Sequence, residues 1–318
     1  MESESRGLTD VHVHLAALPD GDNGCIFSPR TLRRPVSRFL AWKFGVDLGR
    51  PAEANEFYVE RLRRELKGSK RVKKAVLLGM DGIYDGNGVL DRARTDFLIS
   101  NRYVVEVAKR HPDFFLAGVS INPRRADALD ELERCAAEAA ALVKFLPNAQ
   151  CFDPADTRYL PFYRALARLK IPLLSHVGYE FSLAGRDQSA GDPQRLRAAL
   201  DEGVSVIAAH GCSHGLFFPE PHLKTALEFA RRYPRFYLDA SALTLPSRVR
   251  MLFLLRRHPE LHERLLFGTD YPLPVLAYPA IGHGYRRAAN ANYFDRQAAV
   301  IESLGIRFKD FSAIKGNT

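Results

Sequence analysis

Residues 8–15 read LTDVHVHL, a short run in which apolar and β-branched side chains alternate with polar ones. This alternation is typical of a β-strand. Seven more short apolar runs follow along the chain, and longer amphipathic stretches separate them. The seven are residues 74–80, 114–121, 141–146, 171–176, 204–210, 236–242 and 265–270. Strands that alternate with helices in this way predict a parallel sheet in an α/β fold.

The spacing of the strands predicts how the sheet is arranged. Polar residues near the ends of the last five strands, at positions 144, 176, 210, 239 and 270, lie 29 to 34 residues apart. One strand and one helix together need about 30 residues. Eight such units favour a closed (β/α)8, TIM-like barrel over an open doubly wound sheet, and no G-x-G-x-x-G follows the first strand.

One connection is about twice as long as the others. It joins the first strand to the second, and we expect its residues 16–50 to form a lid or a substrate-binding excursion over the mouth of the barrel. A proline-rich segment, residues 271–283, should lie beside it. The length of 318 residues fits a single barrel domain over 1–318.

Composition and charge patterning argue against nucleic-acid binding and against a membrane span. The net charge of +9 and the pI near 9.4 raise the question of nucleic-acid binding. The densest basic piece, residues 61–74, reads as the solvated end of a helix and the approach to a strand, so we expect no nucleic-acid partner. No stretch approaches 18 uninterrupted apolar residues, which predicts no membrane span. The start of the chain is charged and no C-x-x-C pair occurs, which favours a reducing cytoplasm.

Ligand-type residues gather at the strand ends. His12 and His14 are two apart on the first strand, so both imidazoles project from one face, and by the same parity Asp10 could orient one of them. His176, His210 and Asp270 each close a later apolar strand. A buried imidazole or carboxylate is costly unless it is paired or binds a metal. Active sites of TIM barrels lie at the carboxyl ends of the strands, so these residues predict a site for zinc or a similar divalent ion.

This set of residues resembles the amidohydrolase superfamily, in particular its amidohydrolase-related group, which includes aminocarboxymuconate semialdehyde decarboxylase. The similarity extends from Asp10 to Pro272. It implies that His12, His14, His176 and Asp270 are the ligands of one divalent ion, usually zinc. It also implies that His210 faces the metal-bound water or the substrate, and that Asp270 and His210 are the catalytic residues.

Lys144 leaves the number of metal ions open. Some superfamily members carry a carbamylated lysine at the end of the fourth strand, where it bridges two metals, but the decarboxylase-like members usually lack this lysine. Lys144 could be such a bridge, a free ammonium that binds an anionic substrate, or a structural cation. One ion is favoured and two remain an alternative, with the ammonium preferred for Lys144.

Weaker candidates for substrate binding lie near the expected mouth of the barrel. They are Glu180, Tyr271 and Arg33, followed by His214, Arg30 and Arg34. The arginines are included because a guanidinium can bind a carboxylate through two hydrogen bonds.

The leading functional hypothesis is a metal-dependent hydrolase. It would activate water to cleave a C–N or C–O bond (amide, lactam, lactone or ester) in a small polar, carboxylated molecule. A non-oxidative decarboxylase or a hydratase of the same group is the first alternative. An inactive barrel that serves as a binding protein is the second. The expected partner is a small-molecule substrate, and a homodimer is compatible with the sequence.

Overall fold

The structure is a computed structural model of the 318-residue chain and describes residues 7–33, 35, 38, 45, 47–181, 183 and 187–314. Eight parallel strands form one sheet, in which each strand pairs with the next along the chain. In order they are β1 (Leu8–His14), β3 (Val72–Leu78), β5 (Phe115–Ser120), β6 (Leu142–Phe145), β7 (Leu173–Ser175), β8 (Val206–Ala208), β9 (Phe236–Asp239) and β10 (Leu265–Leu266).

The first and the last strand meet, which closes the sheet into a barrel. The Val11 N–H donates to the Phe267 carbonyl at 3.0 Å, and the Asp270 N–H donates to the His12 carbonyl at 2.9 Å. The eight strands coincide with the eight apolar runs of the sequence. The prediction of a (β/α)8 barrel is therefore confirmed.

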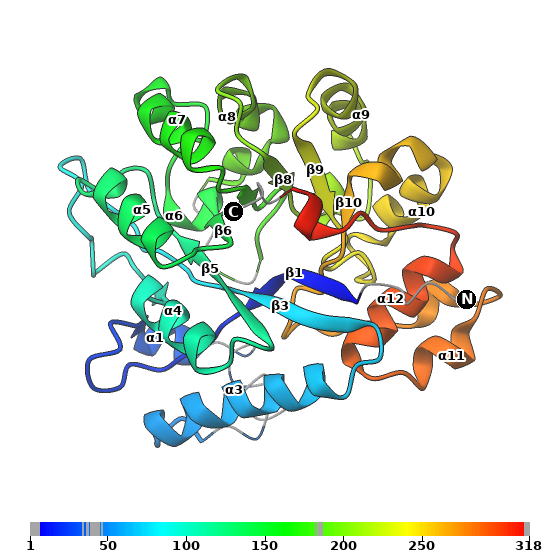
Figure 1. Ribbon diagram of the computed structural model, residues 1–318, viewed down its shortest axis with the longest axis horizontal. Coiled ribbons are helices and arrows are strands. Elements are labelled where there is room, and N and C mark those ends of the chain that lie inside the picture. The colour runs from blue at the N-terminus through cyan, green and yellow to red at the C-terminus, as the bar shows by residue number, and fades with distance from the viewer. Residues whose placement is uncertain are drawn as a thin grey trace.

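Helices surround the barrel, as Figure 1 shows. At least one helix follows each barrel strand, and these helices include α3 (Pro51–Lys67), α4 (Asn101–Arg110), α5 (Ala128–Ala137), α7 (Leu160–Leu169), α8 (Arg197–Asp201), α9 (His222–Arg232), α10 (Val249–Arg257) and α12 (Tyr293–Ser303). Local sequence signals start several of them. Pro51 stands at the first turn of α3, and the Ser100 hydroxyl caps α4 by accepting from the Tyr103 N–H.

Short elements occupy the connections. They are the helices α1 (Pro29–Leu32), α6 (Pro147–Gln150) and α11 (Tyr285–Ala289), the 3-10 turns η1 (Thr157–Tyr159), η2 (Gln188–Gly191), η3 (Pro193–Leu196), η4 (His210–Cys212), η5 (Pro259–Arg264), η6 (Tyr278–Ala280) and η7 (Phe311–Ala313), and the antiparallel pair β2 (Ile26–Phe27) and β4 (Phe97–Leu98). None of the helices that the structure describes is long and apolar enough to cross a membrane.

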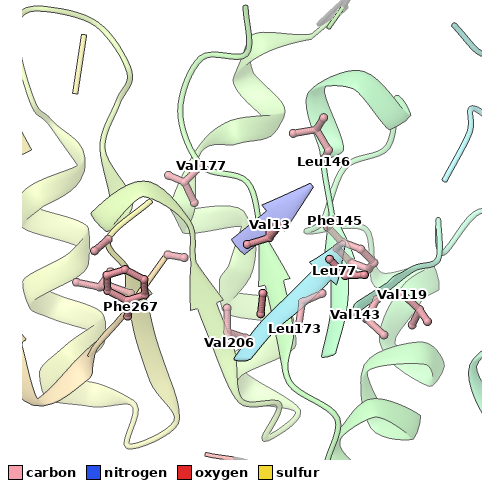
Figure 2. Close-up of a cluster of buried hydrophobic side chains, with 14 of the residues drawn as sticks. Val13, Leu77, Val119, Val143, Phe145, Leu146, Leu173, Val177, Val206 and Phe267 are labelled. Atoms are coloured by element: carbon pink, nitrogen blue, oxygen red, sulfur yellow. The ribbon is translucent and has the colours of Figure 1, made fainter. Parts of the chain in front are cut away.

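Two apolar clusters make up the core, one outside the barrel wall and one inside it. Figure 2 shows part of the outer cluster, to which Leu77 and Leu173 belong. The inner cluster contains the sequence neighbours of these two residues, Val76 and Leu174, because successive side chains of a strand point to opposite faces. Phe311 of η7 also packs into the inner cluster.

The inner cluster gives way to polar residues toward the carboxyl ends of the strands. Lys144 follows Leu142 by two positions and therefore lies on the same face of β6. Asp239 likewise follows Tyr237 by two positions in β9. All four side chains are buried. The fold therefore collects charged groups at one end of the barrel interior.

Strand β1 departs from simple alternation. Its register with β3 shifts between Asp10 and Val13, and Val11 packs into the inner cluster although Val13 packs into the outer one. The Asp10 carboxylate accepts hydrogen bonds from the His12 N–H at 2.9 Å and from the Thr269 hydroxyl at 2.6 Å. Asp10 therefore holds the backbone near His12 and not a histidine ring, which differs from the expectation based on parity.

The long connection after β1 lines the mouth of the barrel where the structure describes it. Phe27 and Thr31 contribute to the wall of a cavity at the carboxyl ends of the strands. Ser28 fixes this segment by donating from its hydroxyl to Asp96 at 2.7 Å. Residues 34, 36–37, 39–44 and 46 lie outside the described residues. The lid over residues 16–50 stays a prediction.

Candidate metal centre

Six ionisable groups converge at the carboxyl ends of the barrel strands. His12 lies on β1, Lys144 on β6 and Asp239 on β9; the others, His176, His210 and Asp270, follow directly or closely after β7, β8 and β10. His210 and Asp270 have backbone φ angles of 60° and 66°, values that non-glycine residues rarely adopt. Strained backbone of this kind is common where side chains must be held for function.

Three of these groups form the centre of the cluster. A ligand atom of His12, one of His210 and one of Asp270 all lie within 4.8 Å of one another, and all three residues are buried. The His14 Nε2 lies 3.2 Å from Asp270 Oδ1, and the His12 Nε2 lies 3.4 Å from the same oxygen. The structure thus brings His12, His14 and Asp270 together as the sequence predicts.

His176 joins the cluster through His210. The His176 Nδ1 lies 3.1 Å from the His210 Nε2 and 3.7 Å from Glu180 Oε2. The other nitrogen, His176 Nε2, is buried and has no hydrogen-bond partner among the described residues. A buried imidazole nitrogen without a partner is costly, and coordination to a metal would satisfy it. This orphaned atom indicates that the residues present fit a divalent ion.

Asp239 orients His12, a role that the sequence reasoning missed. Its Oδ2 lies 2.7 Å from the His12 Nδ1, and its Oδ1 accepts the His210 N–H at 2.9 Å. The Ser241 hydroxyl also donates to Asp239 and contacts both histidines. With the Nδ1 of His12 held by a carboxylate, the Nε2 can carry the lone pair that a metal needs.

Burial makes the histidines of the site poor bases. It lowers the pKa of His12, and the neighbouring Lys144 lowers it further. Burial likewise holds the pKa values of His176 and His210 well below the usual range, and the Arg248 guanidinium adds to the effect. The three imidazoles are therefore neutral at pH 7, the form that binds a metal ion.

Asp270 is ionised, although it is buried. Burial by itself would raise its pKa, but the nearby His12 imidazole, a hydrogen bond from His14 and the Lys144 amine outweigh the effect of burial and hold the pKa of Asp270 below its usual value. An ionised carboxylate among neutral imidazoles gives the cluster the donor set that zinc accepts.

Lys144 reaches into the same cluster. Its Nζ lies 3.3 Å from the His12 Nε2, and the side chain is 1% exposed. Burial lowers the pKa of Lys144 to about 8, although Asp239 and Asp270 act in the opposite direction. A fraction of this amine is thus neutral near pH 7.5. The neutral amine is the form that reacts with CO₂, and it carries no positive charge.

A cavity of about 400 Å³ opens above the cluster. Predicted site residues that line it are His14, Lys144, His176, Glu180, His210 and Asp270. Much of the remaining wall is apolar and includes Leu15, Phe27, Tyr58, Phe97 and Phe181. The ionisable groups therefore form one polar region in an otherwise apolar chamber.

Of the weaker candidates, Glu180 lines the cavity and the others that the structure describes lie elsewhere. The Tyr271 ring packs among Tyr58, Tyr293 and Phe294, while its neighbours Asp270 and Pro272 line the cavity.

Arg33 is exposed at the end of α1, and Arg30 forms an ion pair with Asp96 at 3.0 Å. The His214 ring stacks edge-on against Tyr179 and His222. Arg34 lies outside the described residues.

Arg248 is a second residue that the sequence reasoning missed, and it lines the cavity. It precedes α10, is 6% exposed and donates to three backbone carbonyls, those of Val177, Tyr179 and Ser213. No sequence motif marks this arginine, because its neighbourhood is rich in basic residues. Asp239, in contrast, was visible as a charged residue that ends an apolar strand at the regular spacing.

Comparisons with known proteins agree with the fold. The family model for amidohydrolases matches residues 9–292. An uncharacterized TIM-barrel protein from Bordetella bronchiseptica is similar at a TM-score of 0.61 and 19% identity, over 94% of this chain and 100% of that chain.

Two further solved structures are similar. A 2,6-dihydroxybenzoate decarboxylase in complex with 2,6-dihydroxybenzoate has a TM-score of 0.56 and 16% identity, over 98% of this chain and 100% of that chain. A probable 2-pyrone-4,6-dicarboxylic acid hydrolase from Acinetobacter baumannii, with citric acid bound, has a TM-score of 0.54 and 12% identity, over 94% of this chain and 92% of that chain. The comparison with curated proteins gives no match.

Proposed function

The chain belongs to the amidohydrolase family and is an enzyme, and from that premise we propose that it uses a divalent metal ion to act on a small carboxylated molecule. His12, His14, His176 and Asp270 would hold the ion. The observation that carries the proposal is that Asp270 Oδ1 lies close to the Nε2 atoms of both His12 and His14, while the buried His176 Nε2 has no hydrogen-bond partner among the described residues. Three imidazoles and one carboxylate are a donor set typical of zinc.

We propose hydrolysis of a C–N or C–O bond as the reaction. A bound divalent ion supplies Lewis acidity, which makes a water molecule a nucleophile at neutral pH. Asp270 is ionised and can accept the proton that this water loses on adding to the substrate carbonyl. The leaving amine or alcohol then takes that proton. Asp239 keeps the His12 ring in a fixed orientation throughout.

His210 and His176 differ in how their ring nitrogens are held. The His210 Nδ1 lies 2.8 Å from the Ser241 hydroxyl, and the His210 Nε2 lies 3.1 Å from His176. His176 keeps one ring nitrogen, Nε2, without a hydrogen-bond partner among the described residues, whereas both ring nitrogens of His210 have one. This difference supports the assignment of His176 to the metal, and we propose that His210, which lines the cavity, faces the substrate oxygen.

Decarboxylation is the second candidate, and the apolar wall of the cavity favours it. Removing a carboxylate from water into an apolar chamber destabilises its charge relative to neutral CO₂. Lys144 could hold the substrate in such a reaction, because it is a buried cation beside the cluster. The two reactions differ in their products, since only one of them releases CO₂.

Metal analysis and product analysis together test the proposal. We expect purified protein to carry about one divalent ion per chain, and chelation to lower its melting temperature reversibly. His12→Ala and His14→Ala should each lose most of the metal, whereas the control His258→Ala should keep it. Folded wild-type protein that neither contains nor takes up zinc would overturn the metal site.

Incubation with a panel of aromatic carboxylates, lactones and amides then separates the reactions. CO₂ release, without a new amine, alcohol or acid product, would replace hydrolysis by decarboxylation. Activity that survives exhaustive chelation would contradict both.

A further inference from the structure

Arg248 is a buried cation without a carboxylate partner. Arg248 is only 6% exposed, yet its guanidinium forms no ion pair with any acidic residue in the part of the chain that the structure describes. Asp270, Glu180, Glu220 and Asp239 act on it only from a distance. A buried charge without a counter-charge is costly, so a protein keeps one where a ligand supplies the missing charge.

The hydrogen bonds of Arg248 leave part of its guanidinium for a ligand. Nη1 donates to the Val177 carbonyl at 3.3 Å and to the Ser213 carbonyl at 3.1 Å, and Nη2 donates to the Tyr179 carbonyl at 3.1 Å. A guanidinium has five N–H groups, so the Nε–H and one Nη2 hydrogen remain. Two parallel N–H groups match the two oxygens of a carboxylate.

The surrounding loops are shaped to hold the guanidinium at the cavity wall. Gly215 has a φ angle of +82°, and a Cβ at this position would lie 3.1 Å from Nη2 and 3.2 Å from Cζ of Arg248. Arg248 itself lines the cavity together with His176 and Glu180. Its contact with Val177, the residue after His176, places it next to the proposed metal centre.

We infer that Arg248 binds the carboxylate of the substrate and that the substrate is a carboxylate with an apolar, ring-sized body. Nearby walls formed by Leu15, Phe27, Phe97 and Phe181 would contact that body. The inference rests on the proposed function only in taking this cavity as the substrate site. Lys144, whose Nζ lies 3.3 Å from the His12 Nε2, would lie beside the reacting part of the molecule.

Binding of matched ligands tests the inference without knowledge of the substrate. Benzoate and the neutral benzamide have the same ring and nearly the same shape, and calorimetry can measure both with the zinc-loaded full chain. We expect wild type to bind benzoate more tightly than benzamide. Arg248→Gln should weaken benzoate binding by about 10-fold or more and leave benzamide binding unchanged, because only benzoate loses a charged hydrogen bond. Arg250→Gln, an exposed arginine two residues away, is the matched control.

Each outcome decides between binding and a merely structural role. Equal affinity of wild type for the two ligands, or unchanged benzoate affinity in Arg248→Gln, would overturn the inference. Equal weakening for both ligands, with a lower melting temperature, would assign Arg248 to holding the loops. If Arg248→Gln does not fold, Arg248→Lys keeps the charge, and its loss of the preference for benzoate would support the inference while a retained full preference would refute it.

The same samples distinguish this inference from the proposed function. If the wild-type protein takes up no zinc but still prefers benzoate in a manner that depends on Arg248, the metal proposal fails and the anion site stands. If zinc is bound and the preference for benzoate is absent, the anion site fails and the metal proposal stands.

Discussion

The His12 ring is held from one side by Asp239, at 2.7 Å from Nδ1, so its Nε2 points toward the centre of the cluster. Asp239→Asn removes the charge of the orienting group but keeps its size. We expect zinc affinity to fall by about 10–100-fold, the usual effect of losing a group that orients a ligand. Titration against a competing chelator measures the change. The exposed Asp187→Asn is the control, and equal affinity in wild type and Asp239→Asn would show that the contact does not act on the metal.

Lys144 offers a second prediction at the level of one residue. If it is a substrate-binding ammonium, Lys144→Ala should keep the metal content and raise KM for a carboxylated substrate, and Lys144→Arg should retain some activity. If it is a carbamate bridge, Lys144→Ala should lose one of two ions, and a short carboxylic acid should partly restore activity. A structural cation would lower stability without a specific kinetic change.

We expect the ammonium, because buried Lys144 lies 3.3 Å from a neutral imidazole and lines the cavity. Two ions per chain in wild type and one in Lys144→Ala, counted by metal analysis, would contradict this expectation and favour hydrolysis.

At the scale of elements, the loop after β7 packs closely against the loop after β8. Gly178 has a φ angle of +86°, and a Cβ there would lie 2.4 Å from the Ser213 carbonyl oxygen. These loops carry His176 and His210, and Arg248 donates to both. Their close approach at Gly178 therefore fixes the spacing of two groups of the candidate site.

Gly178→Ala should separate these loops. We expect a loss of about 2–5 kcal/mol in the free energy of unfolding, since backbone strain and a steric clash act together. Gly203→Ala, at a φ of +80° with only the far end of Arg235 within 4 Å, introduces the strain without the clash and should cost roughly 1–2 kcal/mol. Urea denaturation measures both, and similar losses in the two variants would show that the loops tolerate the added methyl group.

For the whole molecule, the pH dependence of stability has a contribution from His222. Its pKa is lowered from 6.5 to about 4, mainly by burial and also by His214 and Arg248, while Asp192 acts in the opposite direction. His222 also begins α9, where the helix dipole disfavours a positive charge. Between pH 4 and 6.5 the unfolded chain binds more protons at this residue than the folded one, so stability falls as the pH decreases through this window.

His222→Phe should reduce this loss of stability. We expect the urea midpoint of the variant to decrease less than that of wild type between pH 6.5 and 4.5, whereas the control His258→Phe should follow wild type. Parallel curves for wild type and His222→Phe would show that other groups cause the acid sensitivity.

The homodimer stays a prediction for the whole molecule. Sedimentation of the full chain would check it.

The amino-acid sequence was sufficient to predict the barrel and most of the groups at its centre. Eight apolar runs with regular spacing are a local property of the chain, and a parallel sheet brings the carboxyl ends of its strands to one edge. Because ligand-type residues lie on or close after strands of this sheet, their positions in the sequence predict that His12, His14, His176, His210 and Asp270 approach one another. The structure places all five at the barrel mouth, where their metal chemistry remains a proposal.

The contacts that hold these groups in place could not be predicted from the sequence, because they form between distant segments of the chain. Asp239 meets His12 across 227 residues of sequence, and this pairing exists only because the barrel closes between β10 and β1. The register of β1 shifts after Asp10, and the Asp10 carboxylate accepts a hydrogen bond from the His12 backbone N–H. Side-chain parity along the strand does not predict this contact. Arg248 reaches the cavity because two loops from other strands offer it carbonyl groups. Such contacts depend on the relative positions of distant segments, whereas sequence periodicity reports only on neighbours along the chain.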